Sequence, residues 1–158
     1  MKKFVVLFLI AAFVSLNAFA AESGTLSLSG SISPTLSVVV AAFGTANTTL
    51  DLTTTPSGTG TKVGTATFTT NRPSWKIYVT STNSSKLNGD VGGEFLAYTF
   101  SIGTLSVDET LAATDTTPIS MTAKAAGVAY DLLIKYTGSS TLAAATYTDT
   151  VTITVSAT

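Results

Sequence analysis

The clearest alternation of polar and apolar residues lies at the end of the chain. From residue 150 to residue 155, threonine alternates strictly with valine or isoleucine. A period of two places each residue type on one face of a strand, so this segment predicts a half-buried β-strand. Its apolar face consists of Val151, Ile153 and Val155.

A run of small residues before this strand predicts a corner. Leu142 is followed by three alanines, and Tyr147 stands just ahead of the strand. In immunoglobulin-like sandwiches a tyrosine at the start of strand F hydrogen-bonds back to the chain that enters the strand, an arrangement called the tyrosine corner. We therefore interpret Leu142 and Tyr147 as such a corner and 150–155 as strand F. The sequence then ends at Thr158 without room for the next strand, G.

Further alternating segments predict a protein made of strands. No segment beyond the first twenty residues has a helical period, so the expected class is all-β, specifically an immunoglobulin-like β-sandwich that is incomplete because strand G is missing. We expect irregular segments at 43–61, with room for a short strand at 50–53, at 83–93 and at 106–117, and a turn at 126–127. Strands are expected at 25–33, 35–42, 62–70, 74–82, 95–102, 118–125 and 128–136.

The apolar faces of these segments predict the core. In 35–42 the inward face is Leu36, Val38 and Val40. A buried tryptophan on the third strand is typical of immunoglobulin-like sandwiches, so a core position is favoured over a sugar-stacking role for the single tryptophan. The core residues expected in the central strands are Trp75, Ile77, Val79, Leu132 and Ile134.

The first twenty residues have the three parts of a secretory signal peptide. Lys2 and Lys3 are basic, residues 4–14 are apolar, and residues 18–20 form a small-x-small cleavage site. We expect 1–20 to be a signal peptide, 21–34 an N-terminal extension and 35–158 a single sandwich domain. The apolar run is too short for a comfortable membrane span, so the protein is expected to be exported and not to span a membrane after the signal is removed.

Charge and composition exclude several classes of function. The chain has eight basic and nine acidic residues, and loss of Lys2 and Lys3 leaves six basic residues and a net charge of −3. Nucleic acids and anionic membranes are bound through clustered lysine and arginine, so neither is an expected partner. The chain contains no histidine and no cysteine, which removes the commonest general base, the commonest metal ligand and any disulfide.

Carboxylates are the remaining candidates for chemistry. Asp108 and Glu109 with Asp115, or Asp90 with Glu94, could hold Ca²⁺ or act as a glycosidase pair. Their spacing fits no calcium-loop motif, and solvated surface charge is the favoured interpretation. We expect no enzyme activity, no cofactor and no metal.

A missing strand G would leave the edge of strand F unpaired and a groove open to the core, which proteins do not leave uncovered. The N-terminal extension is a candidate cover, because its residues Leu26, Leu28, Gly30 and Ile32 share one face. The groove edge would be Val151, Ile153 and Val155. Burying the three large side chains would contribute about 5–9 kcal/mol, while ordering each backbone residue costs about 1–2 kcal/mol. Hydrogen bonds to the strand F edge would therefore matter, as in donor-strand complementation.

Three segments together carry a resemblance to a known family: LSLSGSISPTL at 26–36, TFTTN at 67–71 and LAAATYTDTVTITV at 142–155. They are similar to chaperone–usher pilins, in particular the alpha-type major pilins of the colonisation-factor kind, and to the related spore-coat-U-like secreted domains. The resemblance implies a subunit that a periplasmic chaperone holds and an outer-membrane usher polymerises. Each extension would fill the groove of a neighbouring copy, and the product would be a cell-surface fimbria that supports adhesion.

Two other functions stay open from the sequence. In the first, 25–33 pairs with strand F of the same chain, giving a self-complete secreted sandwich that binds carbohydrate or another surface ligand through Tyr78 or the loops. The link Ser33-Pro34 leaves little slack for that path, which favours pairing between chains. The second is a secreted hydrolase, which the missing histidine and cysteine disfavour.

Overall fold

The computed structural model describes residues 28–42, 50–114 and 117–158. The chain divides into two compact units, residues 1–32 and residues 33–158. In the first unit the described residues, 28–32, have no regular secondary structure. None of the described residues belongs to a helix that is long and apolar enough to cross a membrane.

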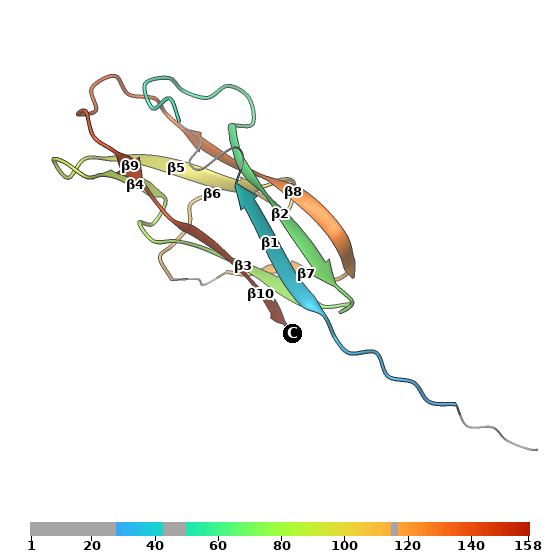
Figure 1. The fold of residues 1–158 in the computed structure, drawn as a ribbon. Coiled ribbons are helices and arrows are strands. Elements are labelled where there is room, and N and C mark those ends of the chain that lie inside the picture. The colour runs from blue at the N-terminus through green and yellow to red at the C-terminus, as the bar shows by residue number, and fades with distance from the viewer. Residues whose placement is uncertain (1–27, 43–49, 115–116) are drawn as a thin grey trace, which may run out of the picture. The chain divides into compact units, whose positions relative to one another are not determined.

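The second unit is built from antiparallel strands (Figure 1). Its described residues contain no helix, and each strand pairing in them is antiparallel, which confirms the predicted all-β class. The strands are β1 (Leu36–Ala42), β2 (Thr61–Thr70), β3 (Trp75–Ser81), β4 (Lys86–Gly89), β5 (Phe95–Ile102), β6 (Ser106–Glu109), β7 (Ile119–Met121), β8 (Ala125–Tyr136), β9 (Tyr147–Thr148) and β10 (Val151–Ala157).

These strands form two sheets with the core between them. The larger sheet has the order β1-β2-β8-β5-β4-β9, with β6 also paired to β5, and the smaller sheet has the order β10-β3-β7. Phe68 of β2 and Trp75 of β3 join the two sheets, with ring centroids 5.5 Å apart and each side chain 1% exposed. Alternation explains this packing, because Gly64, Ala66 and Phe68 all lie on the buried face of β2.

Most predicted strands are confirmed within a residue or two. β1, β2, β3, β5 and β10 match the predicted segments 35–42, 62–70, 74–82, 95–102 and 150–155. β7 lies inside the predicted segment 118–125 and forms one edge of the smaller sheet. The predicted core residues Trp75, Ile77, Leu132 and Ile134 are buried, and Val79 is half-buried against them.

The predicted turn at 126–127 is wrong, because β8 runs through it. Phe68 pairs with Val128 and Thr69 with Ala126, so Gly127 is an extra residue in the strand. Its φ of +73° is the conformation that glycine adopts at such a β-bulge. The glycine that suggested a turn therefore marks an irregularity inside a long strand.

Two loops predicted from their polarity contain strands, and the short strand for which 50–53 had room is absent. β4 and β6 are short strands whose residues are mostly polar. β6 pairs with β5 alone, and β4 lies between β5 and β9. Residues 50–53, by contrast, form no strand, and 52–53 lie in a turn. Four-residue segments with one apolar position carry no period, so only tertiary pairing decides them.

Two predictions about the N-terminal part also need correction. The strand predicted at 25–33 is absent from its described part, residues 28–33, and residues 25–27 lie outside the described residues. Alternation produces a strand only where a neighbour accepts the backbone hydrogen bonds, and no described strand pairs with 28–33. Val40, predicted to face the core, is 51% exposed.

Candidate functional site: an apolar groove at the open sheet edges

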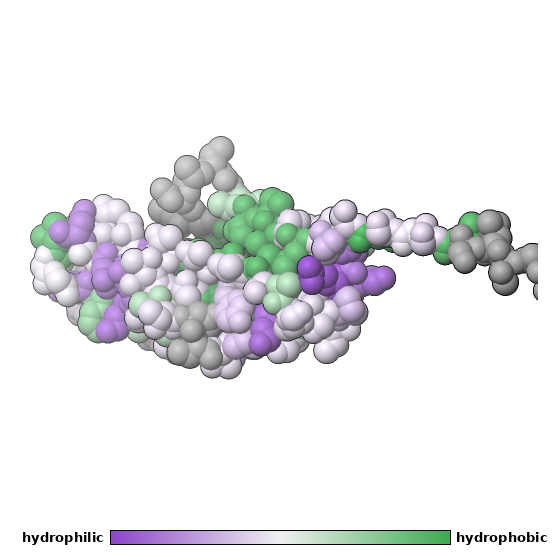
Figure 2. Space-filling model, turned by 90° about the horizontal axis from the view of Figure 1, so that it is seen from below, coloured by the Kyte–Doolittle hydropathy of each residue, from purple (hydrophilic) through white to green (hydrophobic). Residues whose placement is uncertain are grey.

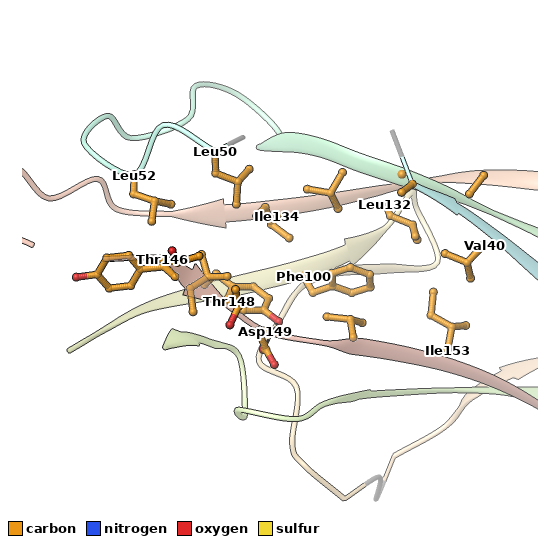
Figure 3. A pocket seen from close by; sticks show the side chains of 18 of the residues that line it. Val40, Leu50, Leu52, Phe100, Leu132, Ile134, Thr146, Thr148, Asp149 and Ile153 are labelled. Carbon is orange, nitrogen blue, oxygen red and sulfur yellow. Dashed lines mark hydrogen bonds between the residues drawn. The ribbon is translucent and has the colours of Figure 1, made fainter. Parts of the chain in front are cut away.

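An apolar groove of about 610 Å³ lies between β1 and β10. Its floor comes from both central strands of the larger sheet, β5 and β8, through Phe100, Leu132 and Ile134 (Figure 3). These three side chains are only 3%, 5% and 6% exposed, so the groove reaches the core. Leu50 and Leu52, from the segment before β2, form part of the wall.

Two unpaired strand edges border this groove. Among the described residues β1 pairs only with β2, and β10 pairs only with β3, so each strand ends its sheet. The two strands are neighbours in space. The backbone donors and acceptors on the free edge of such a strand can pair with an added strand.

The side chains with which these edges line the groove are apolar. Val40 of β1 and Ile153 of β10 lie toward the same end of the groove, near Leu132 (Figure 3). Val151 lies two residues before Ile153 on β10, and both of these side chains are half-buried. Figure 2 shows one large hydrophobic area on the face seen from below, with smaller ones elsewhere, while much of the remaining surface is only weakly polar. The groove therefore offers an apolar surface beside open backbone edges.

The opposite end of the groove is polar, and Asp149 organises it (Figure 3). One carboxylate oxygen of Asp149 accepts hydrogen bonds from Ser81 Oγ at 2.5 Å and Tyr98 Oη at 2.7 Å. The other accepts from the backbone N–H groups of Asn83, at 3.0 Å, and Thr150, at 2.7 Å. One side chain thus ties the end of β3 and the middle of β5 to the residue before β10.

The environment of Tyr98 keeps its phenol protonated. The side chain is 5% exposed, and burial together with the hydrogen bond to Asp149 raises the pKa of the phenol well above its usual value. Tyr98 therefore stays neutral and acts as a hydrogen-bond donor at any ordinary pH. Its role here is structural, because its hydroxyl proton is already committed to Asp149.

The segment that leads into β10 forms a closed corner. Tyr147 Oη lies 3.1 Å from the carbonyl oxygen of Ala143 and 3.0 Å from a carboxylate oxygen of Glu94, so its one proton points at two acceptors. The same Glu94 oxygen accepts from Ala143 N at 2.7 Å. The backbone contact to Ala143, four residues back, has the form expected of a tyrosine corner, and Leu142 packs against the core.

Three of the candidate carboxylates, Asp90, Glu94 and Asp108, have structural partners. Asp90 accepts a hydrogen bond from Thr146 N at 2.9 Å, and Asp108 pairs with Lys135 at 2.6 Å. No group of three or more carboxylates, histidines or cysteines gathers anywhere in the described part of the chain, and Asp115 lies outside it. Asp90 therefore braces the segment before β9, and Asp108 links β6 to β8.

Some of the residues predicted for the groove edge line the groove, and the residues predicted for the strand that fills it are solvent-exposed where they are described. Val151 and Ile153 line the groove, whereas Val155 packs against the core beyond it. In the extension, Leu28 and Ile32 are 86% and 88% exposed, and a Cβ built on Gly30 would meet no atom within 4 Å. Leu26 lies outside the described residues.

Sequence reasoning missed part of the groove. Asp149 was not singled out, since one carboxylate ahead of a strand has no distinctive pattern. Leu50 and Leu52 sit in a segment without a period, so nothing marked them as groove wall. Phe100 belongs to a predicted strand with no clean polarity, and only the sheet topology shows which of its faces is inward.

Comparisons with known proteins give no indication of the function of this chain. Neither the protein-family models nor the curated proteins contain a match to this sequence. The groove and the sequence of the extension are therefore the features that bear on function.

Proposed function

We propose that this chain is a structural subunit of a surface fimbria that assembles by donor-strand complementation. The observation that carries the proposal is the groove between β1 and β10, which combines an apolar floor with two unpaired strand edges. The proposed occupant is the extension of a neighbouring copy, residues 26–32. The subunit would thus be both acceptor and donor, as a linear polymer requires.

The shape of the site favours a strand over a small molecule. An added strand can pair its backbone with the free edge of β10 and place alternate side chains on the floor. Residues 26–32 have this pattern, with Leu26, Leu28 and Ile32 on one face and glycine between them. The exposed fractions of Leu28 and Ile32, 86% and 88%, leave most of their apolar surface to be buried on binding.

The strand order supports an immunoglobulin-like assignment. In that scheme β1, β2, β8 and β5 take the places of strands A, B, E and D, and β3 and β10 those of C and F. The position of strand G is then the outer side of β10, beside the groove. The proposed donor strand fills this position.

The cellular route follows from the same proposal. A subunit with an open edge would aggregate unless a partner covered it during export, which suits a periplasmic chaperone and an outer-membrane usher. The signal-peptide pattern at 1–20 is in keeping with export. No enzyme activity, metal or cofactor enters this proposal.

The proposal is tested with a truncated subunit and a peptide. Residues 34–158 would be produced without the extension and titrated with a synthetic peptide of residues 21–33. We expect saturable one-to-one binding and a rise in melting temperature, because a ligand that binds only the folded state stabilises it. A peptide with Leu28→Asp and Ile32→Asp is the matched control and should bind far more weakly.

The outcomes separate the competing functions. Equal binding of both peptides, or binding of neither by a folded domain, would refute the complementation site. A second measurement uses residues 21–158 on a denaturing gel with and without boiling. A ladder that collapses on heating supports exchange of strands between subunits, whereas a monomer in both lanes indicates a self-complete secreted sandwich.

A further inference from the structure

We infer that Asn71 is a positioning residue that makes complementation occur between copies of the chain instead of within one. This inference rests on the proposed function and adds a determinant of partner choice. Asn71 follows the end of β2 and faces the segment just before β1. Its carboxamide Nδ2 donates to the carbonyl oxygen of Ser33 at 2.8 Å, and its Oδ1 accepts from Thr35 N at 2.8 Å.

This pair of hydrogen bonds fixes residues 33–35 in an extended conformation. In a strand, the C=O of one residue and the N–H of the second residue after it point to the same side. A single carboxamide that bonds both groups therefore acts as one more rung of the β1–β2 ladder, beyond the pair Leu36–Thr70.

Neighbouring groups reinforce the same conformation. Thr70 Oγ1 donates to the carbonyl oxygen of Thr35 at 2.8 Å and accepts from Arg72 N at 3.0 Å. Thr70 is 3% exposed, so this contact is held inside the domain. Pro34 lies between the two clamped residues, where its missing N–H would point to the opposite, open edge, and no hydrogen bond is lost.

The clamp opposes the path that self-complementation needs. The groove borders Val40, Ala41 and Ala42, at the far end of β1 from Thr35. A chain that continues β1 in line through Ser33 is directed away from that end. To enter its own groove, the chain must reverse at residues 33–35 and release both bonds to Asn71.

The test is Asn71→Ala in the mature chain, residues 21–158. The chain is refolded from urea, and the monomer-to-oligomer ratio is measured by light scattering and on unboiled denaturing gels. We expect this ratio to rise about tenfold, because losing two hydrogen bonds that oppose the turn shifts the balance by that order. Residues 26–32 of the variant monomer should then be protected from hydrogen exchange.

Two further variants control the experiment. Asn71→Asp keeps the acceptor for Thr35 N and loses the donor to Ser33, so its ratio should lie between those of the wild type and Asn71→Ala. Asn88→Ala, the same type of change in β4, should leave the ratio unchanged. A ratio for Asn71→Ala within twofold of wild type, or variant monomers with unprotected extensions, would overturn the inference.

The peptide assay distinguishes this failure from failure of the proposed function. Asn71 does not line the groove, so a truncated domain with Asn71→Ala should bind the 21–33 peptide as the unmodified domain does. If the peptide binds and the ratio does not change, only the role of Asn71 is refuted. If the peptide binds neither domain, the groove itself is not a strand-binding site.

Discussion

Replacing Asp149 tests whether one carboxylate secures the start of β10, the strand that borders the groove. Asp149→Ala removes the acceptor of four hydrogen bonds, two from side chains and two from backbone N–H groups. The side-chain donors are the more consequential pair. Ser81 is 0% exposed and Tyr98 is 5% exposed, so water cannot easily replace the carboxylate at either hydroxyl.

The expected cost follows from this burial. A buried polar group left without a partner costs about 1–3 kcal/mol, so two hydroxyls give about 2–6 kcal/mol. The backbone donors lie nearer the surface and can bond water, and the variant no longer has to desolvate a carboxylate. We therefore expect the free energy of unfolding to fall by about 2–4 kcal/mol, a large share of the roughly 5–15 kcal/mol typical of a domain.

The assay is urea unfolding of residues 21–158 at neutral pH, followed by the fluorescence of Trp75. This residue is the single tryptophan of the chain and is 1% exposed, so its emission reports loss of the core. The matched control is Asp131→Ala, which removes an exposed ion pair with Lys62 and should cost less than about 1 kcal/mol.

A double-mutant cycle sharpens the result. In a Tyr98→Phe background, one of the two hydroxyls that would lose their acceptor is already absent. Asp149→Ala should therefore cost about 1–3 kcal/mol less than in the wild type. If Asp149→Ala costs no more than Asp131→Ala, or if the cycle shows no coupling, the carboxylate does not hold β10 in the way described here.

Three further predictions concern the same region. A Cβ at Gly64 would lie 2.6 Å from the carbonyl oxygen of Ala41 in β1, so Gly64→Ala should destabilise the domain by about 1–3 kcal/mol, and an unchanged melting curve would contradict that close approach. Stability should fall as pH rises above about 10, because the raised pKa of Tyr98 means that the unfolded chain loses this proton first; Tyr98→Phe should reduce that slope in urea titrations, and an equal slope would refute the assignment. Tyr147→Phe removes the hydroxyl bonded to Ala143 and should cost about 1 kcal/mol with faster hydrogen exchange in residues 143–146, whereas unchanged exchange would show that the corner holds without it.

The fold class could be predicted from the sequence because alternation records burial. Segments such as β2 and β10 face core on one side and water on the other, so their side chains carry a period of two. The same reasoning failed where pairing alone makes a strand. β4 and β6 are polar and short, and the bulge at Gly127 was mistaken for a turn, since a glycine with positive φ fits both.

Only one side of the groove could be predicted from the sequence. Its β10 side was predicted, because Val151 and Ile153 belong to a strictly alternating strand. Its β1 side was assigned to the core, since periodicity does not distinguish a side chain that meets another sheet from one that meets an open space. Val40 shows the difference: it lies on the predicted inward face and is nevertheless 51% exposed, where the opposite wall stands apart.

The exposure of Val40 favours an occupant that is apolar toward the groove and polar toward water. The chain is rich in threonine and serine and has few charged residues, and much of the surface in Figure 2 is only weakly polar. A strand from residues 26–32 would turn its leucines and isoleucine toward Val40 and the floor of the groove, and Ser27, Ser29 and Ser31 toward water. The filled edge would then match the chemistry of the surrounding surface. An occupant that alternates in this way buries the apolar groove and leaves no new apolar patch, which a ligand that is apolar on all sides could not do.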